Sequence, residues 1–243
     1  MEPVYEAEIA LRARDADFCA AWKPGAIFIA MQELGEAHSA LWNAGYFALR
    51  QKGLAWVVTR TLLMIDRAPV IGDVIRCRTW PGKPRHAIYP RYYTFEDKDG
   101  NSFARASSLW VLMDIAAREM VSGEKYGLTG FPAPDVKPPV ENPGGIMQVP
   151  GEALRAAQPV KFTDLDVNRH VNNARYVDWL CDRFPCEWHE RYRLERLLVH
   201  FASETRPDEA LETVLTTDGT AFMFSGERDG HAHFLMSGNF APR

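Results

Sequence analysis

Residues 62–75 read LLMIDRAPVIGDVI, and residues 197–211 read LLVHFASETRPDEAL. In each stretch an apolar run ends in a bend that contains a proline and an acidic residue, and a second run then begins. Short runs rich in leucine, isoleucine and valine predict β-strands, and proline is typical of the breaks between strands. Because the same order occurs at two distant places, the sequence predicts two units of similar structure.

The first unit extends to both sides of residues 62–75. Residues 25–42 have apolar side chains at helical spacing, which predicts a helix before the strands. An Asp-Gly pair at residues 99–100 is a strong hairpin signal between the last two strand-like runs. The predicted strands cover residues 54–66, 72–81, 86–97 and 102–114.

The second unit repeats this order. Residues 171–184 predict a helix, and Asp-Gly pairs at 218–219 and 229–230 mark two hairpins after it. The predicted strands cover residues 194–204, 210–218, 220–229 and 231–240. The fold class is therefore α+β, with two tandem helix-plus-antiparallel-sheet repeats. Either repeat alone would have a thin core, so we expect the two sheets to join into one continuous sheet.

A change of composition separates the two units. Residues 127–145 are crowded with proline and glycine, which excludes a helix or a central strand and predicts a linker. We therefore divide the chain into an N-terminal repeat at 1–122, a linker at 123–150 and a C-terminal repeat at 151–243.

The bulk composition excludes several function classes. A net charge of −4 argues against non-specific nucleic-acid binding, which needs a basic stripe, but leaves a local basic patch open. Four scattered cysteines, without a CxxC pair, indicate reduced thiols. The acidic N-terminus lacks a signal pattern and no apolar run is long enough to span a membrane, so we expect a cytoplasmic protein. Motifs for nucleotides, serine hydrolases and metals are also missing, and we expect neither a cofactor nor a metal.

One polar stretch stands apart from the strand pattern. Residues 163–176 read TDLDVNRHVNNARY, with Asp, Asn or His at every second position from 164 to 172. In a strand these side chains would share one face, but Asp and Asn favour turns and helix caps. The stretch therefore indicates a loop, and the residues alone leave a cap-and-turn device and a catalytic loop as equal alternatives.

Five stretches together resemble a known family. They are WVVTR at 56–60, GDVIRCRTW at 72–80, RASSLWVLMD at 105–114, DLDVNRHVNNARYVDW at 164–179 and FASETRPDEALE at 201–212. In this order, and over nearly the whole chain, they are similar to the acyl-acyl-carrier-protein thioesterases, which end fatty-acid synthesis in plant plastids and many bacteria. The resemblance implies a double hotdog fold, in which each antiparallel sheet wraps around one long helix.

The resemblance also implies a catalytic set. The family has an Asp-x-Asn-x-His loop before the second helix and a glutamate on a later strand, and the matching residues here are Asp166, Asn168, His170 and Glu204. Many plant members have a cysteine directly after that glutamate, whereas this chain has Thr205. A thiol nucleophile at this position is therefore excluded.

Two mechanisms fit these groups. In the favoured one, His170 and Glu204 deprotonate a water molecule, Asn168 orients the water or binds the carbonyl, and Asp166 fixes the loop. In the other, Asp166 attacks the thioester and the acyl anhydride is hydrolysed afterwards.

The resemblance further places the acyl chain in the first repeat, with acyl carrier protein as the partner. The expected substrate-binding residues are Met31, Leu34, Trp56 and Val58 for the chain and Arg169 and Arg175 for the acidic carrier. A second basic group, Lys83, Arg85 and Arg91, is a further candidate for carrier contact. A homodimer is expected by analogy of fold alone.

Three functions follow, in order of preference. The first is hydrolysis of fatty acyl-acyl carrier protein to free fatty acid and carrier protein. The second is an acyl-CoA thioesterase of the same fold, and the third is a non-catalytic protein that binds acyl thioesters. The polar loop disfavours the third, because a binding protein would not need it.

Overall fold

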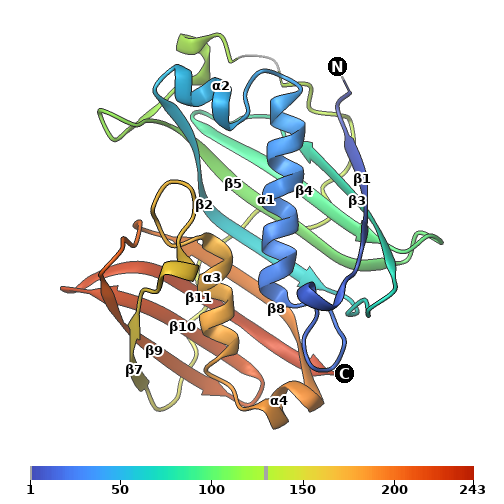
Figure 1. Ribbon diagram of the computed structural model, residues 1–243, viewed down its shortest axis with the longest axis vertical. Helices are drawn as coiled ribbons and strands as arrows, with labels where there is room; N and C mark the ends of the chain where they lie inside the picture. The colour runs from blue at the N-terminus through green and yellow to red at the C-terminus, as the bar shows by residue number, and fades with distance from the viewer. Residues whose placement is uncertain (1, 129–130) are drawn as a thin grey trace.

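The computed structural model describes residues 2–128 and 131–243 (Figure 1). The first half contains β1 (Tyr5–Ala10), α1 (Pro24–Ala40), α2 (Tyr46–Gln51), β2 (Leu54–Ile65), β3 (Val74–Pro81), β4 (Ile88–Glu96), β5 (Ser102–Asp114) and β6 (Glu119–Val121). The second half contains β7 (Leu154–Pro159), α3 (Asn173–Cys181), α4 (Cys186–Arg191), β8 (Tyr192–Phe201), β9 (Ala210–Asp218), β10 (Ala221–Arg228) and β11 (His231–Pro242). Single 3-10 turns lie at Ala13–Asp15, Gly123–Tyr126 and Phe162–Asp164.

The strands form one sheet, and its order is symmetric about the centre. The order is β1-β3-β4-β5-β2 in one half and β8-β11-β10-β9-β7 in the other, with β6 beside β5. The halves meet where β2 pairs antiparallel with β8, and Leu62 lies opposite Leu198. These leucines belong to the two stretches whose similarity predicted the duplication. The continuous sheet is thus confirmed.

Helices α1 and α3 lie side by side on one face of this sheet (Figure 1). They bury one shared core, in which Phe28 and Met31 of α1 join Val177 and Leu180 of α3. Gly25 begins the contact between the helices, because a Cβ at this position would overlap the carboxylate of Asp178. The core therefore spans both repeats, as expected for units too small to fold alone.

The predicted helices and main strands are confirmed, whereas the edge strands β1 and β7 were missed. Their sequences, YEAEIA and LRAAQP, are mostly exposed and contain few large apolar residues. Edge strands tolerate such sequences because one side faces solvent. In the two described segments, no helix has the length and apolar content needed to cross a membrane.

The proline- and glycine-rich segment runs along the sheet and is held there by side chains. Ser107 donates a hydrogen bond to the carbonyl of Glu141 at 2.6 Å, and His200 Nε2 contacts the carbonyl of Gly144 at 2.7 Å. Further along, Ser237 Oγ accepts a hydrogen bond from the Met147 N–H. Residues 129–130 of the predicted linker lie outside the described residues.

One glycine is required by the close approach of β11 and β8. A Cβ on Gly238 would overlap the backbone carbonyl of Arg196 and touch the ring of Phe222. We expect Gly238→Ala to lower the free energy of unfolding by about 1–3 kcal/mol, because a fixed backbone cannot move aside. Gly144→Ala is the matched control, since nothing lies within 4 Å of its Cβ. Equal midpoints in chemical denaturation for both variants would contradict this prediction.

Candidate active site

The polar stretch is a tight loop between the turn at Phe162–Asp164 and α3. A bridge between Leu165 and Val171 closes it, and the Asp166 N–H donates to the His170 carbonyl at 2.8 Å. Asp166 Oδ1 accepts the N–H groups of Asn168 and His170 at 2.8 and 3.2 Å. Arg169 takes the left-handed conformation, with φ of 63°. One carboxylate oxygen of Asp166 therefore organises the loop, while Oδ2 makes only a 3.5 Å contact with the Asn168 amide.

The end of the loop caps α3 and also joins the two repeats. Asn172 Oδ1 accepts the Ala174 N–H at 2.9 Å, so Asn172 is the N-cap of α3. Its side-chain amide also donates to Gln32 Oε1 of α1 at 3.2 Å. Asp164 accepts the Lys161 N–H and is a turn former. The loop thus begins with a turn formed by Asp164 and ends with a helix cap formed by Asn172.

Glu204 lies beside His170, in the bend that follows β8. His170 Nε2 and Glu204 Oε2 are 3.3 Å apart. The other oxygen of Glu204 accepts hydrogen bonds from Arg118, at 2.9 Å, and from Arg206. Arg118 belongs to the turn between β5 and β6, so the first repeat helps to hold a residue of the second.

This environment keeps Glu204 ionised. Burial by itself would raise its pKa, but the hydrogen bonds from Arg206 and Arg118, together with His170, outweigh burial and lower the pKa below its ordinary value. A lowered pKa suits a carboxylate that orients a histidine and stabilises its protonated form, and does not suit a proton donor.

The lowered pKa predicts a pH-dependent contribution to stability. In the folded protein Glu204 binds its proton at lower pH than in the unfolded chain, so its stabilising contacts are complete above the ordinary value of 4.5 and are lost as pH falls through the lowered pKa. We expect Glu204→Gln to lower the melting temperature at pH 7 and the deficit to shrink toward pH 3. Glu190→Gln, on the exposed side of α4, is the control. A deficit independent of pH would contradict the assignment.

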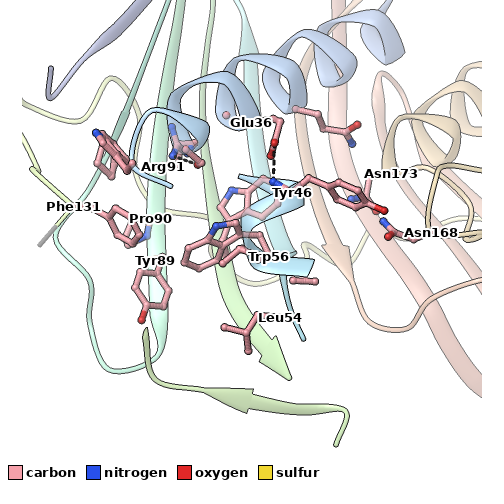
Figure 2. A pocket seen from close by; sticks show the side chains of 18 of the residues that line it. Glu36, Tyr46, Leu54, Trp56, Tyr89, Pro90, Arg91, Phe131, Asn168 and Asn173 are labelled. Carbon is pink, nitrogen blue, oxygen red and sulfur yellow. Dashed lines mark hydrogen bonds between the residues drawn. The ribbon is translucent and has the colours of Figure 1, made fainter. Parts of the chain in front are cut away.

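A cavity of about 380 Å³ opens beside the loop (Figure 2). Asp166, Asn168, Asn172 and Asn173 line one part of it. Aromatic and aliphatic side chains from the first repeat and the linker form most of the remaining wall: Trp42, Tyr46, Leu49, Leu54, Trp56, Tyr89, Trp110 and Phe131. A mostly apolar cavity of this size with a few polar groups is typical of a small-molecule site.

The structure brings the four predicted catalytic residues into one region, but only two of them line the cavity. Asp166 and Asn168 line the cavity, whereas His170 and Glu204 form a pair outside its lining. Thr205 is fully buried, accepts a hydrogen bond from Tyr176 and contacts His233. Thr205 therefore has a structural role and does not face the cavity.

The expected wall of the acyl site needs correction. Trp56 lines the cavity and donates a hydrogen bond to the Ala44 carbonyl at 3.0 Å. Met31 and Val58 instead border a separate void of about 10 Å³, and Leu34 packs in the common core. Met31 and Leu34 both belong to the shared core, and none of the three residues lines the cavity.

The basic residues expected to contact the carrier lie in different environments. Arg169 is exposed, whereas Arg175 is paired with Asp178 at 2.8 Å. Arg91 was expected on the surface with Lys83 and Arg85, in contact with the carrier. This prediction is wrong, because the Arg91 side chain is buried in the cavity wall. Burial lowers its pKa.

Sequence reasoning missed several residues of the site. Gln32 comes from α1, Tyr46 from α2 and Phe131 from the linker, and each lines the cavity. Phe131 packs against Trp42 and Trp56 at ring-centre distances of 5.3 and 6.1 Å. An aromatic residue isolated in a segment of prolines and glycines was the available signal for Phe131.

Comparisons with known proteins match both repeats. The family model of the acyl-ACP thioesterase N-terminal domain matches residues 2–125, and that of the C-terminal domain matches residues 148–235. A palmitoyl-acyl carrier protein thioesterase of Arabidopsis thaliana is 30% identical over 180 residues, or 70% of this chain and 43% of the relative. The oleoyl-acyl carrier protein thioesterase 1 of the same plant is 26% identical, over 77% of this chain and 56% of the relative. The chain thus spans about half the length of the curated relatives it matches.

Solved structures show the same fold. The 12:0-ACP thioesterase from Umbellularia californica superimposes with a TM-score of 0.87 at 22% identity, covering 100% of this chain and 99% of the other. An acyl-ACP thioesterase from Bacteroides thetaiotaomicron gives the same TM-score at 20% identity, covering 98% of each chain. The double hotdog fold is therefore confirmed, and with both domain models matched in order, this chain belongs to the acyl-ACP thioesterase family.

Proposed function

We propose that this chain hydrolyses the thioester of fatty acyl-acyl carrier protein, releasing the free fatty acid and the carrier, in the step that ends fatty-acid synthesis. The observation that carries the proposal is the cavity, where Asp166 and Asn168 stand at the edge of an aromatic and aliphatic wall. An acyl chain fits such a wall, and a thioester carbonyl fits the polar loop. The names of the matched relatives support the same substrate class.

In this proposal the first repeat, with the linker residue Phe131, holds the acyl chain and the second repeat supplies the reacting groups. Water attacks the thioester carbonyl carbon, and the carbon–sulfur bond breaks as the carrier thiol leaves and takes up a proton. With the hydrogen of His170 on Nε2, facing Glu204, Nδ1 remains to accept the proton of the water. The first turn of α3, at Asn173, lines the cavity and favours negative charge on the carbonyl oxygen.

The cavity lining gives the second mechanism more support than the sequence did. The Asp166 carboxylate lines the cavity, whereas His170 and Glu204 do not. Direct attack by Asp166 Oδ2 on the carbonyl carbon would break the carbon–sulfur bond, release the carrier thiol after it takes up a proton, and form an anhydride, which water would then hydrolyse. Both mechanisms give the same products.

The test is the release of free fatty acid from a chain-length series of acyl-acyl carrier proteins. The proposal expects turnover with an optimum length, because each buried methylene contributes about 0.8 kcal/mol until the cavity is full. Tight binding of every substrate without any release of acid would overturn the proposal in favour of a binding protein. The cytoplasmic location and the homodimer stay predictions, and the plant relatives are described as chloroplastic.

The carrier would dock beside the loop. An open groove of about 920 Å³ adjoins the cavity and shares Gln32 and Asp166 with it. Its rim presents Phe162 and Val167, with 90% and 79% of their surface exposed, next to the cation of Arg169. An acidic carrier is attracted by such a rim.

We expect Arg169→Glu to raise KM for acyl-acyl carrier protein roughly fivefold at low salt, while KM for the matching acyl-CoA changes little. The expectation rests on one lost attraction and one added repulsion at an exposed site. Arg14→Glu is the control, since the Arg14 side chain is 77% exposed and lies in the first repeat, outside the lining of the groove. Equal effects on both substrates would argue against carrier contact at Arg169.

A further inference from the structure

The cavity wall contains a buried cation that the proposed hydrolysis does not use. Arg91 of β4 is 9% exposed and lines the cavity. Its Nη1 contacts His38 Nδ1 at 3.2 Å and Thr79 Oγ1 at 3.4 Å, and its Nη2 donates to Ser39 Oγ at 3.0 Å. Within residues 2–128 and 131–243 no carboxylate lies within ion-pair distance of Arg91.

The acceptors around Arg91 are neutral. His38 is fully buried, and its Nε2 contacts the Glu2 carbonyl at 3.1 Å. Burial, reinforced by Arg91 and partly offset by that carbonyl, lowers the pKa of His38 to about 4, so the ring is uncharged at neutral pH. Its Nδ1 then accepts a hydrogen from Arg91. A buried cation without a direct ion pair is costly, and here the charge of Glu36 only partly offsets the effect of burial.

Unused hydrogen-bond donors remain on this part of the wall. A guanidinium has five N–H groups, and the contacts to His38, Thr79 and Ser39 use three of them, leaving the Nε–H and one Nη2–H of Arg91 without an acceptor among the described residues. Beside it, the indole nitrogen of Trp42 is buried and also lacks a partner in the described structure. Both side chains line the same cavity. The wall therefore offers donors to an acceptor atom inside the cavity.

A neighbouring carboxylate indicates which acceptor fits. Glu36 also lines the cavity, and its Oε1 accepts the Tyr46 N–H at 2.7 Å (Figure 2). A ligand carboxylate would be repelled by this charge, whereas an uncharged hydroxyl or oxo oxygen would not. Figure 2 shows Arg91 on one side of the view and Asn168 on the other, with Tyr46 and Trp56 between them.

We propose that Arg91 and Trp42 form a subsite for an uncharged oxygen on the acyl chain, so that the preferred substrate is an oxo- or hydroxyacyl thioester oxygenated far from the thioester. The proposal rests on the proposed function for the orientation of the chain, with the thioester at the loop of Asp166 and Asn168. A fully saturated chain would leave the unused donors without an acceptor, whereas an oxo or hydroxyl oxygen would supply one, so the saturated chain binds less tightly.

The experiment measures binding without hydrolysis. Its probes are matched amide analogues of acyl-pantetheine, one saturated and the others with an oxo group placed at successive carbons of the distal half. We expect wild-type protein to bind one oxo analogue about tenfold more tightly than the saturated analogue of equal length, the effect of one hydrogen bond to a charged donor. Saturated chains that bind as tightly as every oxo analogue would overturn the proposal.

Two variants assign the preference to the subsite. Arg91→Met removes the guanidinium together with the hydrogen bonds to His38, Thr79 and Ser39, so Trp42→Phe, which removes only the indole N–H and part of the ring, provides the second variant. The ratio of the two affinities should fall toward one in both. Trp188→Phe is the matched control, because the Trp188 indole nitrogen is also buried without a partner but lies outside the cavity lining.

An unchanged ratio in both cavity variants would overturn the subsite. If the preference for an oxo analogue depends on Arg91, the subsite is supported. If the same protein hydrolyses no acyl thioester, the proposed function is overturned. The two proposals therefore fail through different results.

Discussion

Replacing His170 by alanine is expected to lower kcat by about 10² to 10⁴, because the water molecule loses its general base. Acyl-thioester binding should survive, since His170 does not line the cavity. Glu204→Ala should have an effect of the same order, because Glu204 lies 3.3 Å from His170 Nε2 and fixes the ring. Steady-state kinetics and equilibrium binding of a non-hydrolysable analogue measure the two effects separately.

The double variant of His170 and Glu204 gives a sharper test. Residues that act as one unit are strongly non-additive, so the double variant should be no slower than the slower single variant. His231→Ala, an exposed position of β11, is the control for removal of an imidazole. Near wild-type kcat in both His170→Ala and Glu204→Ala would remove this pair from the mechanism.

If Asp166 attacks the thioester, replacing it by asparagine is expected to lower kcat by about 10³ with little change in the melting temperature. The asparagine oxygen can still accept the N–H groups of Asn168 and His170, so the loop keeps its shape. The change removes the carboxylate that lines the cavity. Asp164→Asn is the matched control, because Asp164 accepts the Lys161 N–H and does not line the cavity.

Labelled water separates the two mechanisms that involve Asp166. If Asp166 attacks the thioester and water then attacks the aspartyl carbonyl of the anhydride, repeated turnover in water enriched in oxygen-18 should transfer label into the Asp166 carboxylate. If water attacks directly, label should appear in the fatty acid alone. Full activity of Asp166→Asn would contradict the anhydride mechanism and favour attack by water, in which Asp166 only fixes the loop.

Much of the fold could be predicted because duplication leaves a clear signal in apolar strands. Leu62 and Leu63 in one strand and residues 197–199 in the other are buried at the central junction, and all of them are apolar. The edge strand β1 alternates charged and small residues and gives no such signal. Tertiary pairing with β3 determines its structure, and single-sequence patterns do not contain that information.

The polar loop could be predicted only because the family pattern supported it. From the residues alone, Asp166 was equally consistent with a turn, and the structure shows that one of its oxygens does organise a turn. The cavity wall could not be predicted in the same way. Apolar periodicity indicates that Met31 and Leu34 are buried, but it does not distinguish a core from a cavity wall.

Arg91 was expected on the surface but is buried. Charged side chains are usually exposed, so the sequence around Lys83 and Arg85 indicated a surface patch. In the fold, the wide aromatic wall and the neutral partners His38 and Ser39 enclose the guanidinium. Such a position depends on residues of α1 and β4 that are distant in sequence, so only the structure could identify it.

The most direct test of the proposed activity is the ratio of kcat/KM for acyl-acyl carrier protein to kcat/KM for the acyl-CoA with the same acyl chain. We predict a strong preference for the protein carrier, because the groove around Phe162 and Arg169 lies beside the polar loop. A ratio near one, with efficient hydrolysis of the acyl-CoA, would contradict the account and identify an acyl-CoA thioesterase of the same fold.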